Sequence, residues 1–432
     1  MSAIINNNTD KIYACKYSVP TLVFMLNDTS VTMNSSNILS IEKTDDYDRN
    51  LRSVIKVSLR MDLRQKIWIM KNKRSIVCKF ELDKIGQDRD ASNFIVGPLK
   101  VWNTTFSLYL NDDDESTDIQ SLEDAIATNE GSSFNVNDIE NDSYYTSENL
   151  IDIYLFNADN YNASMKPFNA VFTEGNMMQM VSRLLTATNH KKVLMSPMEN
   201  YDVYKELLVP ANEAYKGLIY LDQHYGFYKH GSLIYYDVDK LYIINLNGRL
   251  TAKEEDEWGE TVFLVTKRVN AQPGNGMIIK QKENINYISI MEDNVNAQKP
   301  SISKNDDVGS AVKVIQIDDI EMSFEEADQS YMNQRNESYT YIKKDDNKFS
   351  SSIIKARMEE NEAIIYINAE NLDISAFTPN KTYKIIFEET SKQERYGKYK
   401  YRLSFAYHMI AVQAENYMTS THRIVLKRCS DD

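Results

Sequence analysis

Apolar and polar side chains alternate one by one in short runs near both ends of the chain, and this alternation most constrains the fold. In the run 54–59, Ile55, Val57 and Leu59 lie on one face, and the run 401–407 repeats the pattern with aromatic residues. Such alternation of β-branched and aromatic residues is typical of strands with one buried face. The sequence therefore predicts a mostly β protein, with a barrel or sandwich within residues 1–110.

Similar runs predict strands along most of the chain. In the first half we expect strands at 54–59, 67–70, 75–80, 99–110 and 151–155. In the second half we expect strands at 261–266, 277–280, 285–291, 311–317, 363–369, 382–388 and 399–407. Pro-Gly-Asn-Gly at 273–276 is a strong turn signal. The polar stretches 292–307 and 323–351 predict loops.

The centre of the chain has helical spacing instead. Steps of three and four residues link Met177, Val181, Leu184, Leu185 and Thr188. This spacing places the side chains on one face of a helix. The runs 191–195, 233–236 and 241–245 predict three short strands after it.

Two further helices are expected between these strands. Asn200 can cap a helix that carries Tyr201, Tyr204, Leu207 and Leu208. Pro210 suits the first turn of another helix, which carries Ala211, Ala214, Tyr215, Leu218 and Ile219. The sequence thus predicts an α+β organisation, with a helical centre between two β-rich parts.

Residues 111–148 hold many Asp and Glu side chains and no Lys or Arg. This composition predicts a solvated acidic loop or insertion, kept open by charge repulsion. A wall that faces DNA or a basic partner is the functional alternative. A calcium-binding loop is disfavoured because the Asp-x-Asp-x-Asp-Gly order is absent.

The overall composition excludes several classes of protein. Lys plus Arg is 49 and Asp plus Glu is 63, so the net charge of −14 disfavours a protein that grips nucleic acid over its whole surface. Cys15, Cys78 and Cys429 are too far apart for a zinc ribbon or a disulfide scaffold. No apolar run approaches the ~18 residues of a membrane helix. The first residues do not resemble a secretion signal, so we expect the chain to fold in a cytoplasm.

The counts of three residue types favour a structural or interaction protein. The chain has 13 Gly and 8 Pro but 28 Tyr. Sites that cradle phosphates or cofactors usually need glycine where the backbone approaches the ligand. Tyrosine, in contrast, suits assembly interfaces that are half apolar and half wet.

No catalytic or cofactor motif is present, so we expect no catalytic residue, no cofactor and no metal site. His224 and His230 lie near Asp222, Asp237 and Asp239, which allows a metal or acid–base site to be drawn. Their spacing fits no helical face, so polar turn residues are the favoured interpretation. The chain has no G-x-S-x-G elbow and no P-loop. A pair of glycosidase carboxylates is left open, because acidic residues occur throughout.

The stretch 60–74 is the main basic segment, and it surrounds Trp68. A stacking platform for single-stranded nucleic acid has this composition. An exposed pair of alternating strands has it too, and we favour that interpretation.

The segment 204–245 carries the most specific pattern in the chain. Its marker residues are Pro210, Leu221, Asp222, Tyr225, Gly226, Phe227, Tyr228, Gly231, Asp237 and Asp239. We expect Gly226 to allow a sharp reversal after a helix, with Phe227 and Tyr228 packing back on that helix. Gly231 is expected to turn a hairpin, and the two last aspartates to satisfy exposed backbone groups.

This segment, about a seventh of the chain, resembles the central module of the tail baseplate hub proteins of contractile and long-tailed bacteriophages and related injection machines. The resemblance implies two tube-like β-barrel or sandwich domains around a smaller helix-containing module. The expected limits are 1–110 for the first tube-like domain, 111–148 for the acidic loop or insertion, 149–250 for the module and 251–432 for the second tube-like domain.

The resemblance also implies a role in the virion. Hub proteins form homotrimers that join the hexameric tail tube to the trimeric central spike and line part of the DNA passage. The implied partners are the tail tube protein, the central spike protein and other baseplate proteins, with DNA passing but not specifically bound and no membrane anchor. The implied location is the tail baseplate, after assembly in the host cytoplasm.

Two alternatives to a hub are kept. The first is another tail-tube or baseplate component. The second is a cell-wall-degrading, carbohydrate-active enzyme, whose aromatic strands would bind sugar and whose acidic residues would cleave it.

Overall fold

A computed structural model describes the chain at residues 16–17, 20–33, 37–48, 52–61, 63–73, 75–85, 99–110, 150–238, 240–246, 260–267, 277–282, 285–298, 311–317, 337–343, 348–372, 374, 377–414 and 417–429.

The strands of the first half are β1 (Lys16–Tyr17), β2 (Thr21–Leu26), β3 (Thr29–Met33), β4 (Ile38–Asp46), β5 (Val54–Arg60), β6 (Val77–Ile85), β7 (Leu99–Leu110), β8 (Leu150–Asn157), β9 (Pro167–Asn176), β10 (Val193–Met195) and β11 (Val203–Glu213). The remaining strands are β12 (Ser232–Tyr236), β13 (Leu241–Asn245), β14 (Glu260–Thr266), β15 (Met277–Lys282), β16 (Ile285–Met291), β17 (Val295–Gln298), β18 (Ala311–Ile317), β19 (Glu337–Lys343), β20 (Ile364–Glu370), β21 (Thr382–Phe387), β22 (Lys400–Ala414) and β23 (Tyr417–Arg428).

Helices are short and few among the described residues, which confirms the mostly β fold class. They are α1 (Leu63–Asn72), α3 (Ala158–Met165), α4 (Met177–Thr188), α5 (Ala214–Tyr225), α8 (Ser350–Glu360), α9 (Thr390–Arg395) and the 3-10 turn η4 (Glu292–Asn294). None of the described helices is long and apolar enough to cross a membrane.

The N-terminal strands and the C-terminal hairpin form a closed circuit of pairings. Its order is β22, β4, β5, β8, β7, β6, β1, β23 and back to β22. The short strand β1 closes the circuit, with Tyr17 opposite Met418 on β23. Inward residues such as Ile55, Val57 and Phe80 are fully buried in the first core. This closure leaves few open edges in this part of the sheet.

The paired strands form one continuous sheet of 16 strands, which also extends from the hairpin on its other side, and we call the N-terminal circuit the first sheet and this other part the second sheet. Its order is β15, β16, β14, β21, β22, β23, β20 and β17. The strands β16, β14 and β21 are parallel neighbours. Phe263, Tyr383 and Phe387 are buried in its core, which is separate from the first core.

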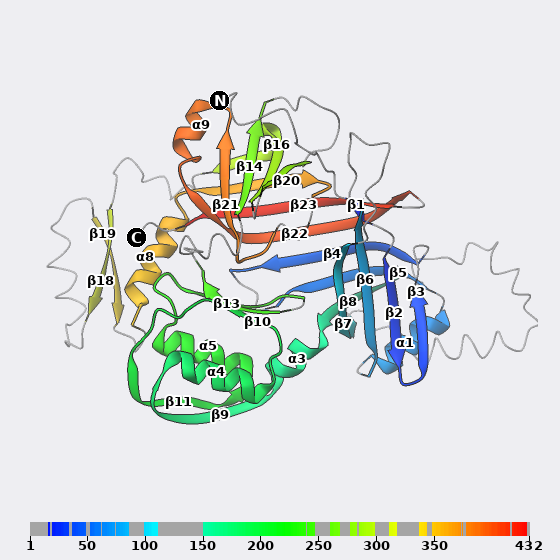
Figure 1. Cartoon of the computed structure of the whole chain (residues 1–432), viewed down its shortest axis with the longest axis horizontal. Coiled ribbons are helices and arrows are strands. Elements are labelled where there is room, and N and C mark those ends of the chain that lie inside the picture. The colour runs from blue at the N-terminus through cyan, green and yellow to red at the C-terminus, as the bar shows by residue number, and fades with distance from the viewer. Residues whose placement is uncertain are drawn as a thin grey trace, which may run out of the picture.

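The hairpin β22–β23 therefore belongs to both sheets (Figure 1). The strand β22 has 15 residues, which is long enough to contribute to two cores in turn. Tyr401 and Leu403 near its start are buried in the second core, whereas Ile410 further along is buried in the first. The red ribbons in Figure 1 run between the N-terminal strands and the strands β14, β16 and β21.

The helical module lies on one side of the hairpin. The antiparallel ribbon β9–β11 wraps beneath α4 and α5, and a small sheet of order β10, β13 and β12 covers the opposite side of the helices (Figure 1). Met177, Leu184 and Leu218 are buried between these layers. The helix predicted at 177–188 is confirmed, as are the strands predicted at 191–195, 233–236 and 241–245.

The strand predicted at 67–70 is wrong, because these residues lie in α1. Lys66, Ile69 and Met70 are buried and lie three and four residues apart, which is the spacing of one helical face. Good helix formers such as Arg, Gln, Lys and Met dominate the run. The basic stretch 60–74 is therefore centred on a helix and not on a pair of exposed strands.

The two helices predicted around Asn200 and Pro210 are also corrected. The residues from Val203 to Glu213 form β11, where Leu207 and Val209 point inward and Leu208 points outward. Pro210 falls at an irregularity in the register between Val209 and Asn212, where a strand tolerates a missing N–H donor. The helix α5 begins only at Ala214, so its later positions were predicted correctly and its start was not.

The remaining expectations have mixed outcomes. The predicted loops at 292–307 and 323–351 are wrong in part, because they contain β17 and β19. Strand pairing crosses residues 110 and 250, and the expected domain limits remain predictions. The acidic stretch 111–148 and the turn 273–276 lie outside the described residues.

Candidate assembly site

The end of α5 gathers several of the marker residues of the segment 204–245. Gly226 ends the helix with a φ of 77°, a conformation that costs a side-chain-bearing residue strain. Its N–H donates to the carbonyl of Asp222 over 2.8 Å. The N–H of Phe227 and the hydroxyl of Ser232 both donate to Oδ1 of Asp222, over 3.1 and 2.5 Å. The Asp222 side chain thus ties the reversal to the next strand.

The carboxyl group of Asp222 is enclosed although part of the residue is exposed. Burial raises the pKa of Asp222 to about 6, and the hydrogen bonds from Ser232 and the Phe227 backbone offset only part of that effect. Near neutral pH this carboxyl group therefore keeps its charge at a cost in folding free energy.

The aromatic residues after Gly226 pack back on the helix. Phe227 and Tyr228 are fully buried in the module core together with Leu221. The Tyr228 hydroxyl lies 2.8 and 3.0 Å from the carbonyl oxygens of Ser196 and Ile243, so it links two strands. Tyr225 packs edge-on against Tyr204 of β11, with ring centroids 5.1 Å apart.

The other marker residues lie elsewhere in the structure. Pro210 is exposed on β11, and Gly231 turns the chain into β12 with a φ of 95°. Asp237 accepts from the N–H of Val238 over 2.7 Å and also pairs with Lys43, 3.1 Å away. Asp239 lies outside the described residues.

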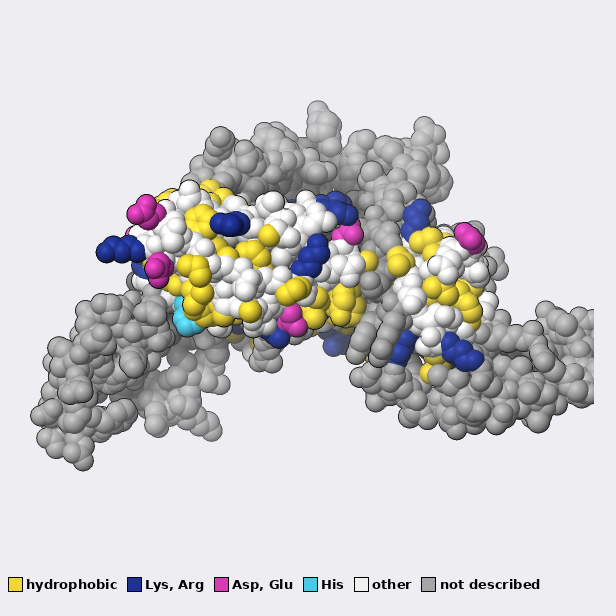
Figure 2. Space-filling model, turned by 90° about the horizontal axis from the view of Figure 1, so that it is seen from below, with side chains coloured by type: hydrophobic (Ala, Val, Ile, Leu, Met, Phe, Trp, Pro, Cys, Tyr) yellow, Lys and Arg dark blue, Asp and Glu magenta, His cyan; other side chains and the backbone are white. Residues whose placement is uncertain are grey.

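The outer face of the β9–β11 ribbon exposes large apolar side chains. Val171 and Leu208 are opposite each other in the ribbon and are 60% and 48% exposed. Tyr201, Val203 and Met178, near the end of the ribbon where Val203 is opposite Asn176, are exposed as well. Figure 2, seen from below, shows the apolar side chains as patches among a few charged ones. Both outer edges of this two-stranded sheet are unpaired among the described strands.

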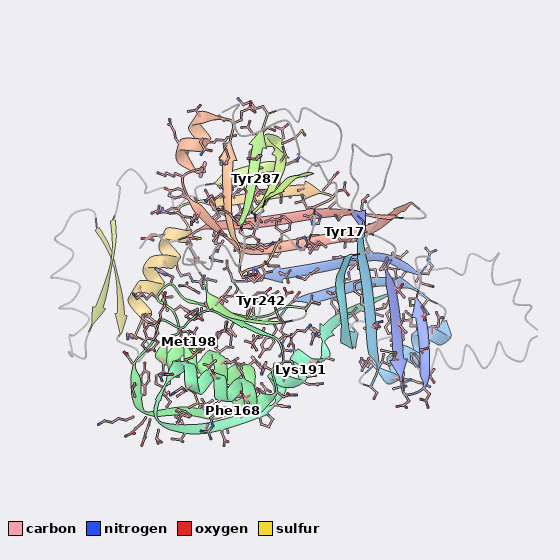
Figure 3. The ribbon with its side chains drawn as sticks, viewed as in Figure 1. Tyr17, Phe168, Lys191, Met198, Tyr242 and Tyr287 are labelled. Carbon is pink, nitrogen blue, oxygen red and sulfur yellow. The ribbon has the colours of Figure 1, made fainter. Side chains whose placement is uncertain are left out.

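The sheet β12–β13 joins the module to the second sheet, because both of its faces are buried. Leu241 and Ile243 face the module core, whereas Tyr235 and Tyr242 belong to the core of the second sheet. In Figure 3, Tyr242 lies between the hairpin above and the helices below, with Met198 and Phe168 on the module side. The module is therefore packed to the rest of the protein through a continuous apolar layer.

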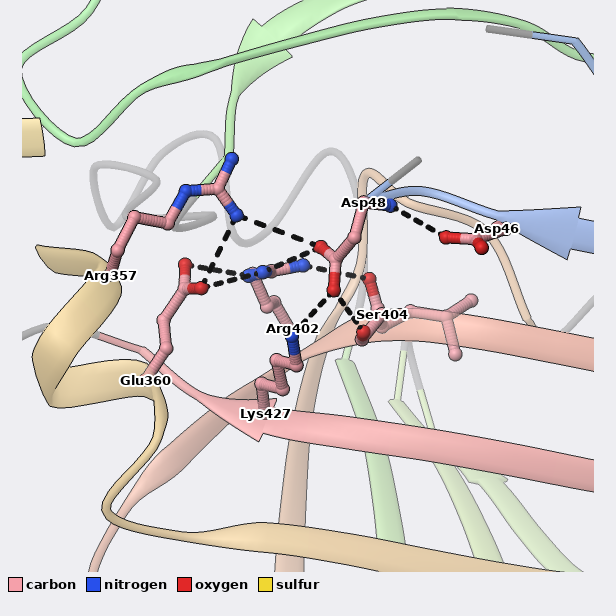
Figure 4. A network of polar contacts seen from close by, with 8 residues as sticks. Asp46, Asp48, Arg357, Glu360, Arg402, Ser404 and Lys427 are labelled. Carbon is pink, nitrogen blue, oxygen red and sulfur yellow. Dashed lines mark hydrogen bonds and ion pairs between the residues drawn. The ribbon is translucent and has the colours of Figure 1, made fainter. Parts of the chain in front are cut away.

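A network of charges fixes the hairpin to the turn after β4 and to the end of α8 (Figure 4). Arg402 on β22 is almost fully buried and binds both oxygens of Glu360 through Nε and Nη2, at 3.0 and 2.8 Å. The same Nη2 donates to Asp48 over 2.8 Å. Lys427 and Ser404 donate to the other oxygen of Asp48, each over 2.6 Å.

The surrounding cations stabilise the charged form of Asp48. Burial by itself would raise the pKa of Asp48, but the Arg402 guanidinium and the hydrogen bonds from Lys427 and Ser404 lower it well below its usual value. The contacts join residues more than 350 positions apart in the sequence. The network therefore needs both ends of the chain in place.

A second buried charge cluster sits where β4 meets β12. Lys43 pairs with Asp45 on its own strand and with Asp237 after β12. The Tyr235 hydroxyl donates to the other oxygen of Asp45 over 2.8 Å. Burial alone would lower the pKa of Lys43, but Asp237 and Asp45 raise it to about 12. The first sheet, the second sheet and the module meet at this cluster.

A small pocket lies beside α3. A pocket lined by Arg52, Asn160 and Tyr161, among others, has a volume of about 20 Å³, which holds about one water molecule. A substrate site usually needs at least about 300 Å³. No group of three or more His, Cys, Asp or Glu side chains suited to a metal ion occurs in the described part of the chain.

Comparison with known proteins identifies the family. The family model described as "Bacteriophage PBS1 gene 109 protein" matches residues 6–429. The chain belongs to this bacteriophage family. The relation to bacteriophage proteins that the segment 204–245 indicated is thus confirmed. No curated protein matches this member of the family.

Solved structures to which the chain is similar include tail proteins. The tail protein from Neisseria meningitidis MC58 is 7% identical, with 94% of this chain and 96% of that chain covered and a TM-score of 0.48. The 43 kDa tail protein of prophage MuSo2 from Shewanella oneidensis is 9% identical, with 94% and 97% covered and a TM-score of 0.46. The E. coli c3393 protein, a component of the type VI secretion system, is 7% identical, with 89% and 73% covered and a TM-score of 0.39.

Sequence reasoning missed the residues of both charge clusters. Lys43, Asp45 and Tyr47 take the inward positions that continue from Ile41 along β4. A charge at an inward position of an alternating strand signals a buried polar network, so this part of the signal was available. Glu360 and Arg402 gave no such signal, because their pairing depends on how distant elements meet.

Proposed function

We propose that this protein is a baseplate central hub of a bacteriophage tail. As a homotrimer it joins the hexameric tail tube to the trimeric central spike, contacts other baseplate proteins and forms part of the passage for DNA. It is a structural protein of the virion and not an enzyme, and DNA passes it without specific binding.

The observation that carries this proposal is the pair of sheets on one hairpin. Three copies of a chain with two β sheets on one hairpin supply six β units, which is the number that a hexameric tube presents. The membership of a bacteriophage family and the hub-like segment 204–245 support the same assignment. Closed rings of identical subunits are the usual way to bury exposed strand edges.

The buried connections between the parts favour a rigid collar that transmits force. The shared hairpin, the Arg402 network and the doubly buried sheet β12–β13 connect the two sheets and the module in the described part of the chain. The exposed ribbon β9–β11 supplies apolar surface on the module side, which suits contact with another tail subunit.

Mass photometry tests the proposal. The chain is mixed at nanomolar concentrations with the tail tube and spike proteins of the same phage, and each protein is also measured alone. We expect particles with three copies, about 150 kDa as three times 50.0 kDa, alone or in complex with spike or tube. Monomers of 50.0 kDa in every mixture would contradict the proposal. Clearing of a cell-wall suspension by the chain alone would favour the enzyme alternative.

A further inference from the structure

Two buried histidines face each other on the hairpin that the two sheets share. His408 on β22 and His422 on β23 are directly opposite in the strand register. Their Nδ1 atoms are 2.7 Å apart, and each residue is only 1% exposed. The ring of Phe377 covers both, with ring centroids 5.8 Å from His408 and 6.4 Å from His422.

The hydrogen bonds around the pair fix where its protons lie. The backbone N–H of Leu372 can only donate, and it lies 3.1 Å from Nε2 of His422, so that nitrogen accepts. The proton of neutral His422 is then on Nδ1, and it is donated to Nδ1 of His408. The proton of neutral His408 is consequently on Nε2, which has no hydrogen-bond partner among the described residues.

In this arrangement neither ring can take another proton without losing a hydrogen bond. Both available lone pairs already accept, one from Leu372 and one from the partner ring. A proton added to His422 displaces the Leu372 N–H and leaves that buried donor unpaired. A proton added to His408 removes the hydrogen bond between the two rings.

The charged groups around the pair oppose protonation as well. On β4, Lys43 is opposite His408 in the register, and its own charge is balanced by Asp45 and Asp237. Further polar neighbours are Ser420 on β23, 2.8 Å from Nε2 of His422, and Tyr17 on β1, which binds Leu372 and Ile374. Burial, His422 and Lys43 lower the pKa of His408 well below its usual value of 6.5.

The segment held by His422 also holds the strand that closes the first sheet. The Tyr17 hydroxyl donates to the carbonyl of Leu372 over 3.2 Å and accepts from the N–H of Ile374 over 3.0 Å. Tyr17 belongs to β1, whose two residues bridge β6 and β23. Leu372 therefore connects the histidine pair to the closure of the N-terminal circuit.

We propose that the His408–His422 pair is a proton-sensitive latch, which acid opens by releasing the Leu372 segment and with it the β1 closure of the first sheet. At neutral pH both rings are neutral and the latch is closed. As the pH falls below about 6.5, the open form binds protons that the closed form cannot accommodate. Its population then rises by up to about tenfold per pH unit for each proton bound. The module, which does not touch the pair, keeps its structure.

Hydrogen exchange of the full-length protein tests the latch. Exchange is followed by mass spectrometry from pH 7.5 to 5, with correction for the chemical pH dependence of free amides. We expect peptides that contain Leu372 or Tyr17 to lose protection by about tenfold or more between pH 6.5 and 5. Peptides from α4 serve as the internal reference and keep their protection. Unchanged protection at Leu372 across this range would overturn the proposal.

Variants that remove one or both rings separate the latch from general acid loosening. In His422→Gln, the amide oxygen accepts from Leu372 and the amide nitrogen donates to His408, so protection near pH 7.5 stays within about threefold of the wild type. Because His408 can still bind a proton when the latch opens, the loss of protection below pH 6.5 becomes less steep in this variant, and it disappears in the double variant His408→Gln/His422→Gln. His224→Gln, an exposed histidine on α5, is the matched control and keeps the wild-type pH response. A response of wild-type steepness in His422→Gln, or one that persists in the double variant, would overturn the proposal.

A measurement on the wild-type protein covers the case in which His422→Gln fails to fold. The protein has five histidines, so ¹³C labelling of the rings gives five resonances. Single substitutions of His190, His224 and His230 assign three of them and leave the two resonances of the pair. We expect two rings with no titration above pH 6 and with the neutral Nδ1–H form for His422. A ring at either position that titrates near 6.5 would overturn the latch.

Discussion

The helical module is packed almost entirely from apolar and aromatic side chains, whereas the junction around the C-terminal hairpin is fixed by buried charges. In the module, Leu218, Leu221 and Phe227 fill a core with the neighbouring strands. At the junction, Arg402 is shared between Glu360 and Asp48 at hydrogen-bond distance. The first region tolerates changes that keep its volume, while the second depends on each partner being present.

The two regions also differ in how far apart in the sequence their contacting residues lie. The module is built from the continuous stretch 167–246, so its contacts are mostly local. The junction brings β4 beside β22, and the hydrogen bonds from Arg402 and Ser404 to Asp48 join residues that are at least 354 positions apart. A protein that transmits force through two sheets gains from this arrangement, because the sheets cannot separate without exposing unpaired buried charges.

Arg402→Met gives the largest expected effect. The substitution removes the cation that Glu360 and Asp48 share and leaves two buried carboxylates without it, so we expect a loss of about 3–5 kcal/mol in the free energy of unfolding. Urea unfolding followed by circular dichroism measures it. Arg395→Met, at an exposed position on α9, is the control and changes stability by no more than about 0.5 kcal/mol. A loss below about 1 kcal/mol for Arg402→Met would show that the charges do not hold the junction.

Gly226→Val tests the module through its backbone. A β-branched residue at a φ of 77° is strained, so we expect a loss of about 2–3 kcal/mol, confined to the module. Gln223→Val, at an exposed position on α5, is the control for adding a valine to this segment. Equal melting temperatures for Gly226→Val and wild type would contradict the placement of the reversal.

Asp222→Asn is expected to stabilise the module at neutral pH. The pKa of Asp222 is raised to about 6 from 3.8, so the fold prefers the protonated form. The stability that protonation gives is present below pH 3.8 and is lost as the pH rises to about 6. Asn keeps the oxygen that accepts from Phe227 and Ser232 but carries no charge, so we expect a gain of about 1–2 kcal/mol at pH 7.5. Thermal unfolding at pH 7.5 and pH 4 checks this, since the gain should vanish at the lower pH. A loss of stability at pH 7.5 would mean that the charge itself is needed.

Leu208→Ser gives the smallest expected change in stability. Leu208 is 48% exposed on the ribbon, so its replacement should alter the unfolding free energy by no more than about 0.5 kcal/mol. Leu207→Ser, one residue earlier and fully buried, is the matched variant and should cost several times more. Equal effects of the two would contradict the register of β11. If the ribbon is a contact surface, Leu208→Ser weakens complex formation in the mass photometry experiment.

The sequence predicted most of the module and little of the junction, and the reasons are physical. The spacing of Met177, Val181 and Leu184 defines a helical face without any information from the rest of the chain. The pattern from Tyr204 to Leu208 was compatible with both a helix and a strand, and pairing with β9 decided it. The apolar positions of so short a run do not distinguish the period of a helix, 3.6 residues, from that of a strand, about 2 residues.

The junction could not be predicted, because nothing local indicates which charges meet. Lys43 and Asp45 at inward positions signalled a buried network on β4, but not its partners. Asp237 was expected to satisfy exposed backbone groups or to cap a turn, whereas it also neutralises Lys43. The strand predicted at 399–407 covers only the first part of β22, and the sharing of β22 between two sheets depends on the strands that flank it on each side.

Electron cryomicroscopy of tails from a virion that carries this protein tests the central claim most directly. The account predicts three copies around the tail axis between the last ring of the tube and the spike, with both sheets of each copy facing the hexameric tube ring. A position along the sheath or outside the tail axis, or a copy number other than three, would contradict it.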